Sequence, residues 1–129
     1  MIKDPNCVFC KIVAGKIPAN IIYEDGQFLA FLDITPFTKG HTLLIPKSHY
    51  RFVWDVPNLD KMILIGQKIV KKYQSIYEDQ LVAGLIWGKD VRHAHLQILP
   101  DTKDLHLNWT RLKLTPEEFK QLEEKLKVD

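Results

Sequence analysis

Along residues 91–100, polar side chains alternate with apolar ones until a proline ends the run. This period of two predicts a half-buried β-strand with His93, His95 and Gln97 together on one face. Successive side chains on such a face stand roughly 7 Å apart, a spacing at which they can surround one phosphate group. The alternative is an ordinary solvated strand face, although such faces favour lysine, glutamate and threonine.

Turn signals divide the first half of the chain into strands. Asp25-Gly26 lies between two strand-like runs and predicts a β-hairpin over residues 21–32. A further strand is expected over residues 40–46, where an apolar run is bounded by glycine and proline. Residues 81–87 predict a buried strand that pairs with the histidine-bearing strand as a second hairpin.

Three helices are expected. A short one ends near Gly15, and apolar residues at three- and four-residue spacing predict a main helix from an Asn58 cap to about Glu78. Thr115 and Glu118 form a capping box that starts a C-terminal helix. The sum is a single α+β domain over residues 1–129, an antiparallel sheet of about five strands with helices on one face.

The composition is that of an ordinary globular protein. The chain has 129 residues, 26% of them charged, and a formal charge of +2, which is too small to favour nucleic acid or an anionic membrane as partner. No signal-peptide pattern or long apolar segment is present, so a cytoplasmic protein is expected. In a reducing compartment, the two cysteines are not expected to form a structural disulfide.

Cys7 and Cys10 form a Cys-x-x-Cys pair close to the start of the chain. A redox pair of the thioredoxin type is disfavoured because no strand precedes it. Metal ligation and two plain buried thiols are the other interpretations, and the sequence pattern alone does not decide between them.

The run His93-x-His95-x-Gln97, two apolar residues and Pro100 resembles the active-site strand of the histidine triad (HIT) superfamily. Most members carry a third histidine where this chain has Gln97. The glutamine form resembles the nucleotidyltransferase and phosphorylase branch. The resemblance implies a HIT-like fold and a nucleotide substrate, and it extends over residues 7–50 and 88–100.

The resemblance also implies roles for the polar residues. Structural zinc would be held by four ligands, a set that zinc favours. The middle histidine, His95, would attack the α-phosphorus and form a covalent nucleotidyl intermediate. Gln97 can donate hydrogen bonds to phosphate but cannot act as a general acid or base. The implied zinc ligands are Cys7, Cys10, His49 and His93.

A nucleotide pocket is implied as well. Asp33 matches the aspartate that binds both ribose hydroxyls, although it could equally cap the turn that follows it. Six apolar residues match positions that contact the base, and ordinary core packing is the alternative for each of them. They are Val8, Phe9, Ile12, Phe31, Ile34 and Leu43.

One departure concerns Asp90, which stands where hydrolase members carry a phosphate-binding hydroxyl residue. Its carboxylate would repel an anionic substrate unless Lys89, Arg92 or a metal offset the charge. The predicted function is nucleotidyl transfer, phosphorolysis or hydrolysis at the α-phosphate of nucleoside 5'-phosphate derivatives, in a homodimer. The alternative is a zinc-stabilised nucleotide-binding or protein-interaction module with little turnover.

Overall fold

An antiparallel sheet with the strand order β1-β2-β3-β5-β4 organises the chain. The computed structural model describes residues 1–105 and 109–129. The α+β class and the five-stranded antiparallel sheet confirm the predicted fold. The strands are β1 (Ile21–Glu24), β2 (Phe28–Leu32), β3 (Thr42–Pro46), β4 (Ala83–Leu85) and β5 (Leu96–Leu99).

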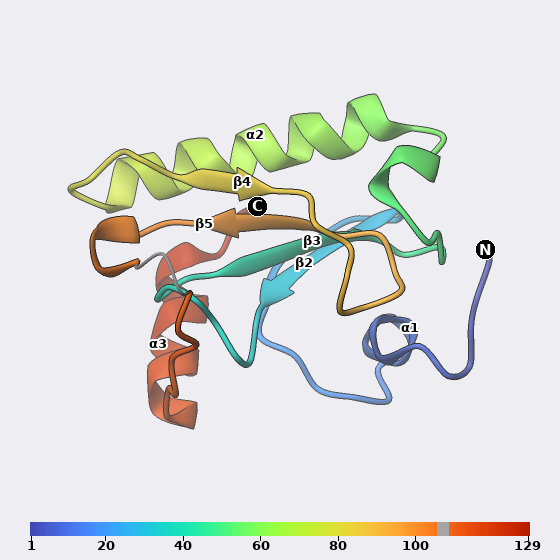
Figure 1. Ribbon diagram of the computed structural model, residues 1–129, viewed down its shortest axis with the longest axis horizontal. Helices are drawn as coiled ribbons and strands as arrows, with labels where there is room; N and C mark the ends of the chain where they lie inside the picture. The colour runs from blue at the N-terminus through green and yellow to red at the C-terminus, as the bar shows by residue number, and fades with distance from the viewer. Residues whose placement is uncertain (106–108) are drawn as a thin grey trace.

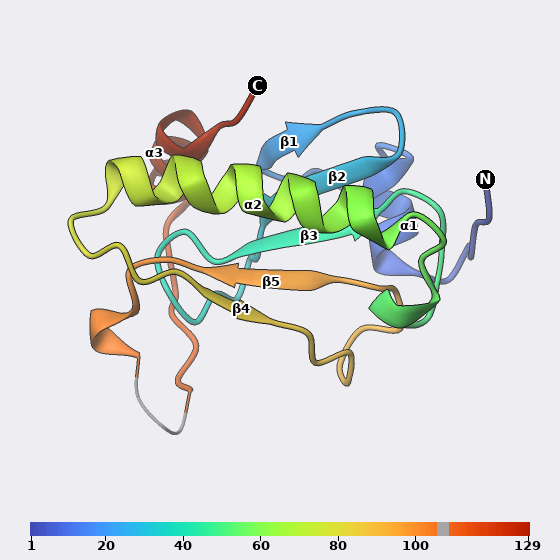
Figure 2. The ribbon, with the colours of Figure 1, turned by 90° about the horizontal axis from the view of Figure 1, so that it is seen from above.

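Helices cover both faces of this sheet (Figures 1 and 2). α2 (Leu59–Ile76) lies along one face, and α3 (Pro116–Leu126) packs against α2 and β1. α1 (Val8–Val13) lies on the opposite face, apart from the face on which helices were expected to concentrate. Two single-turn 3₁₀ helices, Val53–Asp55 and Thr102–Asp104, follow β3 and β5.

The predicted hairpin joins β1 to β2. Asp25 closes its turn, because Oδ1 accepts hydrogen bonds from the backbone N–H groups of Gln27, at 2.7 Å, and Phe28, at 2.8 Å. β2 then pairs with β3 in regular register from Phe28↔Pro46 to Leu32↔Thr42. These central strands are buried on both faces, which fits their continuous apolar sequence.

α2 buries one stripe of side chains against the sheet. Met62, Ile69 and Tyr73 are inaccessible to solvent, and a Cβ atom on Gly66 would lie 3.1 Å from Leu96. Gly66 therefore allows the close approach of helix and sheet. The helix begins after Asn58 as predicted, but the Asn58 side chain donates to Gln27 and makes no capping bond.

α3 starts with the predicted capping box. Thr115 Oγ1 accepts from the backbone N–H of Glu118, and the Glu118 carboxylate accepts from the backbone N–H of Thr115, both at 3.1 Å. At the other end, Leu126 is fully buried, and Val128 N–H donates to the Ile22 carbonyl at 2.8 Å. Across residues 1–105 and 109–129, no helix is both long and apolar enough to span a membrane.

Two predicted strands are shorter in the structure. β4 has three residues and is only half-buried, because it forms the edge of the sheet and pairs with β5 alone. β5 begins at Leu96, so His93 and His95 precede it rather than lie within it. The segment before β5 bends away from the sheet ladder, and Ala94 N–H donates to the Tyr50 carbonyl at 2.7 Å.

Candidate functional site

Four metal-ligand side chains converge between α1, the end of β3 and the start of β5. Cys7 caps α1, Cys10 lies within it, and His49 and His93 come from the two strand ends. All four ligand atoms lie within 4.8 Å of one another. Fold topology therefore brings together residues that are 86 positions apart in the sequence.

The distances between these atoms fit one tetrahedral ion. Cys7 Sγ lies 3.4 Å from His93 Nδ1, and Cys10 Sγ lies 3.5 Å from His49 Nδ1. The two Nδ1 atoms are 3.2 Å apart. Zinc bonds of about 2.3 Å to sulfur and about 2.0 Å to nitrogen put tetrahedral donors about 3.3–3.8 Å apart.

The histidines present the correct nitrogen to this centre. Because the Pro46 carbonyl can only accept, the 2.8 Å contact shows that His93 Nε2 carries the hydrogen and Nδ1 carries the lone pair. Burial lowers the pKa of His93 to about 4, so the ring is neutral at pH 7. His49 has Nε2 4.0 Å from an Asp4 carboxylate oxygen.

His95 is also oriented by a backbone carbonyl, but through Nδ1 and not through Nε2 as in His93. Its Nδ1 lies 2.7 Å from the His93 carbonyl oxygen and donates to it. In the neutral form of this imidazole, the lone pair is therefore on Nε2, which is the requirement for a nucleophile. The ring is 6% exposed and meets the Phe9 ring edge to face at 5.6 Å.

Gln97 is oriented by His41, which is also buried. The backbone N–H of Phe37 donates to His41 Nδ1 at 3.0 Å, so the neutral imidazole carries its hydrogen on Nε2. That nitrogen donates to Gln97 Oε1 at 2.9 Å. Burial lowers the pKa of His41, which keeps the ring neutral. With Oε1 fixed by His41, the NH₂ group of Gln97 is directed away from it.

A cavity of about 300 Å³ lies in front of His95 and Gln97. Its wall includes every residue that the sequence predicted to contact nucleotide: Val8, Phe9, Ile12, Phe31, Asp33, Ile34, Leu43 and Asp90.

The apolar residues of this cavity wall differ in how far they are exposed to solvent. Phe9, Phe31 and Leu43 belong to the core, whereas Val8 and Ile34 are 42% and 74% exposed. Core packing therefore does not account for Val8 and Ile34.

Asp33 has a different environment at each oxygen. Oδ1 accepts from the backbone N–H of Thr35 at 2.9 Å, so the turn-capping interpretation is correct for this atom. Oδ2 lies 3.7 Å from His41 Nε2 and 3.6 Å from Arg111 Nη1. One carboxylate can therefore cap a turn and still present an acceptor to the cavity.

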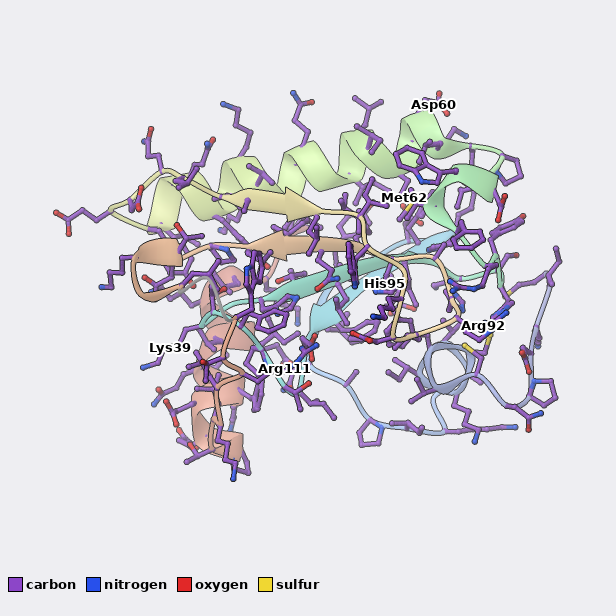
Figure 3. All side chains as sticks on the ribbon, in the orientation of Figure 1. Lys39, Asp60, Met62, Arg92, His95 and Arg111 are labelled. Atoms are coloured by element: carbon purple, nitrogen blue, oxygen red, sulfur yellow. The ribbon has the colours of Figure 1, made fainter. Side chains whose placement is uncertain are left out.

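Asp90 faces a cation that the sequence did not indicate. Arg111 Nη2 lies 3.8 Å from its Oδ2. Lys89 and Arg92 were the cations expected to offset this carboxylate, but Arg111 reaches it from the segment before α3. Figure 3 shows Arg111 and His95 on the side of the sheet away from α2, with Arg92 beyond His95.

The sequence analysis missed His41, which orients Gln97, and Arg111, which faces both carboxylates of the cavity. His41 could have been found, because it continues the alternation of Leu43 and Ile45, which line the same face as the cavity. Arg111 carried no comparable signal, since it lies outside the strands and helices.

His95 just before β5 and Gln97 within it, beside a Cys₂His₂ cluster that includes His93, define a protein of the histidine triad class. Residues 14–104 match the model of the HIT domain, and the chain belongs to this family.

Two relatives with described activities are similar over most of this chain. It is 35% identical to the adenosine 5'-monophosphoramidase of Schizosaccharomyces pombe, covering 94% of this chain and 96% of the relative. It is 38% identical to the adenylylsulfatase of Arabidopsis thaliana, covering 74% of this chain and 52% of that longer protein.

A similar protein of known structure contains zinc. The zinc-bound histidine triad family protein from Mycobacterium smegmatis superposes with a TM-score of 0.75 at 36% identity, covering 94% of this chain and 93% of that one. Together with the donor set and its tetrahedral spacing, this identifies the cluster of Cys7, Cys10, His49 and His93 as a structural zinc site.

Proposed function

We propose that this protein acts on nucleoside 5'-phosphate derivatives and forms a covalent nucleotidyl intermediate on His95. The observation that carries the proposal is the bond from His95 Nδ1 to the His93 carbonyl, which leaves the lone pair on Nε2 at a cavity wall. Membership of the HIT family and the phosphoramidase and adenylylsulfatase names of two relatives support a nucleotide hydrolase.

His95 and Gln97 have different roles in the first step. His95 Nε2 attacks the α-phosphorus, a P–N bond forms, and the bond to the leaving group breaks. The NH₂ group of Gln97, directed by His41, donates to a phosphoryl oxygen as negative charge develops there. Cys7, Cys10, His49 and His93 would hold zinc, and ligation would fix His93, whose carbonyl orients the nucleophile.

The nucleoside occupies the apolar part of the cavity in this proposal. Phe9, Phe31 and Leu43 form the inner wall for the base, and the exposed Val8 and Ile34 form the rim. Asp33 Oδ2 accepts from the ribose hydroxyls.

Transfer and hydrolysis differ only in the second step. Because an amide does not titrate, Gln97 cannot activate water as a base. This favours an acceptor that is already nucleophilic, such as phosphate, over water. Nucleotidyl transfer or phosphorolysis is therefore the reaction that we propose, and hydrolysis is the alternative second step.

Intact-protein mass spectrometry tests the proposal directly. The zinc-loaded protein is mixed briefly with adenosine 5'-phosphosulfate, whose sulfate can depart without a proton, beside His95→Ala, with zinc content and circular dichroism checked for both. A mass gain of one adenylyl group in the parent alone supports His95 as nucleophile. Adding phosphate to the adduct then gives ADP if transfer is preferred, and AMP if water is.

An adduct that also forms on His95→Ala would place the nucleophile elsewhere. Tight nucleotide binding with neither adduct nor turnover would overturn the enzymatic proposal and favour a binding module.

The free edge of the sheet supports a homodimer as part of this proposal. β4 has a partner on one side only, and its central Gly84 is exposed. Exposed apolar side chains lie on α2 and beside β4, at Leu64, Leu81 and Trp87. Light scattering gives the molar mass of the parent and of Leu64→Glu. A dimer mass for the parent and a monomer mass for Leu64→Glu are expected, and the same mass for the two proteins would contradict this interface.

A cytoplasmic location also stays a proposal. It is supported by the two free cysteines, Cys7 and Cys10, because zinc-binding thiolates persist in a reducing compartment.

A further inference from the structure

A second cavity, of about 360 Å³, adjoins the nucleotide cavity. Asp90, Gln97 and Arg111 line both cavities, so these residues form the junction between them. Trp87 and Trp109 line the second cavity but not the first. A substrate whose phosphorus lies at Gln97 would therefore extend its leaving group past Arg111.

Arg111 is held at this junction from several directions. Nη1 donates to the Thr35 carbonyl at 2.7 Å, and the guanidinium lies 4.0 Å from the centre of the Phe37 ring. Phe37 in turn stacks on His41 at 5.6 Å. The position of the cation is thus tied to the residue that orients Gln97.

The carboxylates near Arg111 do not saturate it. Asp33 and Asp90 lie 3.6 and 3.8 Å away, beyond good hydrogen-bond distance. A guanidinium has five N–H donors, and the bond to Thr35 uses one of them. Among the residues in 1–105 and 109–129 that line the two cavities, Arg111 is the one with a permanent positive charge.

Gln97 makes this charge important for the chemistry. A leaving group such as an amine must be protonated as it departs, and an amide cannot supply that proton. A phosphate or sulfate can depart as an anion without a proton, provided that its charge is stabilised.

We propose that Arg111 binds an anionic leaving group at the junction of the two cavities and so selects substrates that carry a phosphate or sulfate beyond the α-phosphate. This inference rests on the proposed function and specifies its substrate class. In the step, His95 Nε2 forms the P–N bond, the P–O bond breaks, and the leaving oxyanion takes the electron pair. No proton passes to it, and the guanidinium stabilises its charge.

Substrate selectivity tests this role of Arg111. The kcat/KM values for adenosine 5'-phosphosulfate and adenosine 5'-phosphoramidate are compared in the zinc-loaded parent, Arg111→Gln, Arg111→Lys and the exposed control Arg92→Gln. We expect Arg111→Gln to lower the value for phosphosulfate on the order of 100-fold, and the value for phosphoramidate less than about 3-fold. Arg111→Lys should retain part of the activity, since it keeps the charge but loses the planar fork.

Equal losses for both substrates would overturn the proposal, because Arg111 would then act on the fold or on the α-phosphate. No loss for either would overturn it as well. Arg92→Gln should retain the ratio of the parent.

Binding distinguishes failure of this inference from failure of the proposed function. If the parent has no turnover, calorimetry with AMP and ADP in magnesium-free buffer still reports on Arg111. Tighter binding of ADP, by about tenfold, that disappears in Arg111→Gln supports the anion site without catalysis. Equal affinities for AMP and ADP in the parent would exclude it.

Discussion

The face of the sheet that carries α2 is held mainly by apolar contacts, whereas the opposite face carries histidines, cysteines and an amide. On the α2 face, Leu44, Ile69 and Met62 are fully buried. On the α1 face, the buried groups include His41, His93 and Gln97, each with a hydrogen-bond partner. The same central strands serve both faces, because alternate residues of β2 and β3 point to opposite sides.

This difference separates stability from chemistry. Hydrophobic burial is non-directional and tolerates some repacking, while the α1 face requires particular nitrogens at particular positions. α1 has only six residues, too few to be stable alone, so zinc and Phe9 hold it against the sheet. We therefore expect metal to control the site face more than the α2 face.

Loss of a zinc ligand should have the largest effect. Cys10→Ser should lower zinc content well below one per chain and destabilise the protein on the order of 5 kcal/mol, a fraction of the zinc-binding free energy of zinc-finger peptides. Metal analysis and urea unfolding measure the two changes. Hydrogen exchange should locate the early loss of protection in α1. A variant that kept one zinc per chain and the parent's unfolding midpoint would contradict this expectation.

Truncation on the α2 face should affect stability alone. Ile69→Ala should cost about 2–5 kcal/mol because Ile69 is fully buried. Ile63→Ala is the matched control, the same substitution in the same helix at a residue that is 46% exposed, and should change stability by less than about 0.5 kcal/mol. Zinc content and nucleotide affinity should be unchanged in both folded variants. If Ile69→Ala released zinc, the two faces would not be separable.

A smaller effect is expected at Asp33, on the site face. Asp33→Asn retains an oxygen that can accept from Thr35 but removes the charge that binds vicinal hydroxyls, so nucleotide affinity should fall about tenfold. Calorimetry with AMP measures this loss. The parent should bind 2'-deoxy AMP more weakly than AMP. Asp33→Asn should lower the affinity for 2'-deoxy AMP by less than it lowers the affinity for AMP. An equal loss for both ligands would assign Asp33 to the turn alone.

Local patterns predicted much of this fold. The Asp25-Gly26 hairpin and the Thr115 capping box each depend on residues close together in the sequence, and both occur as predicted. β4 was misjudged as buried, because an apolar run of that length does not reveal whether its strand will lie inside a sheet or at its edge. The predicted histidine strand was too long, because the chain bends before Leu96 and Ala94 N–H donates to the Tyr50 carbonyl.

Only part of the site was predicted from the sequence. The zinc ligands and the cavity residues came from family resemblance, since their convergence depends on strand ends that are distant in sequence. Arg111 depends on the path of the chain between β5 and α3, which no periodicity specifies. The sequence therefore indicated only Lys89, Arg92 or a metal as groups that could offset Asp90, although Arg111 lies 3.8 Å from it.

The smallest effect expected concerns pH and the buried imidazole of His41. Burial lowers its pKa below the usual 6.5, so between pH 6.5 and the lower folded value the unfolded chain binds more protons than the folded one. Stability must then fall as the pH decreases below 6.5, by at most about 1.4 kcal/mol per pH unit from this group. His41→Gln removes that titration and places an amide N–H near the position of the imidazole Nε2, from which it can donate to Gln97. Urea unfolding at pH 7.5, 6.5 and 5.5 should give a shallower decline for His41→Gln than for the parent, with zinc content followed in both. Identical slopes would mean that His41 takes up its proton as readily in the folded protein as in the unfolded chain, and the fixed orientation of Gln97 would lose its physical basis.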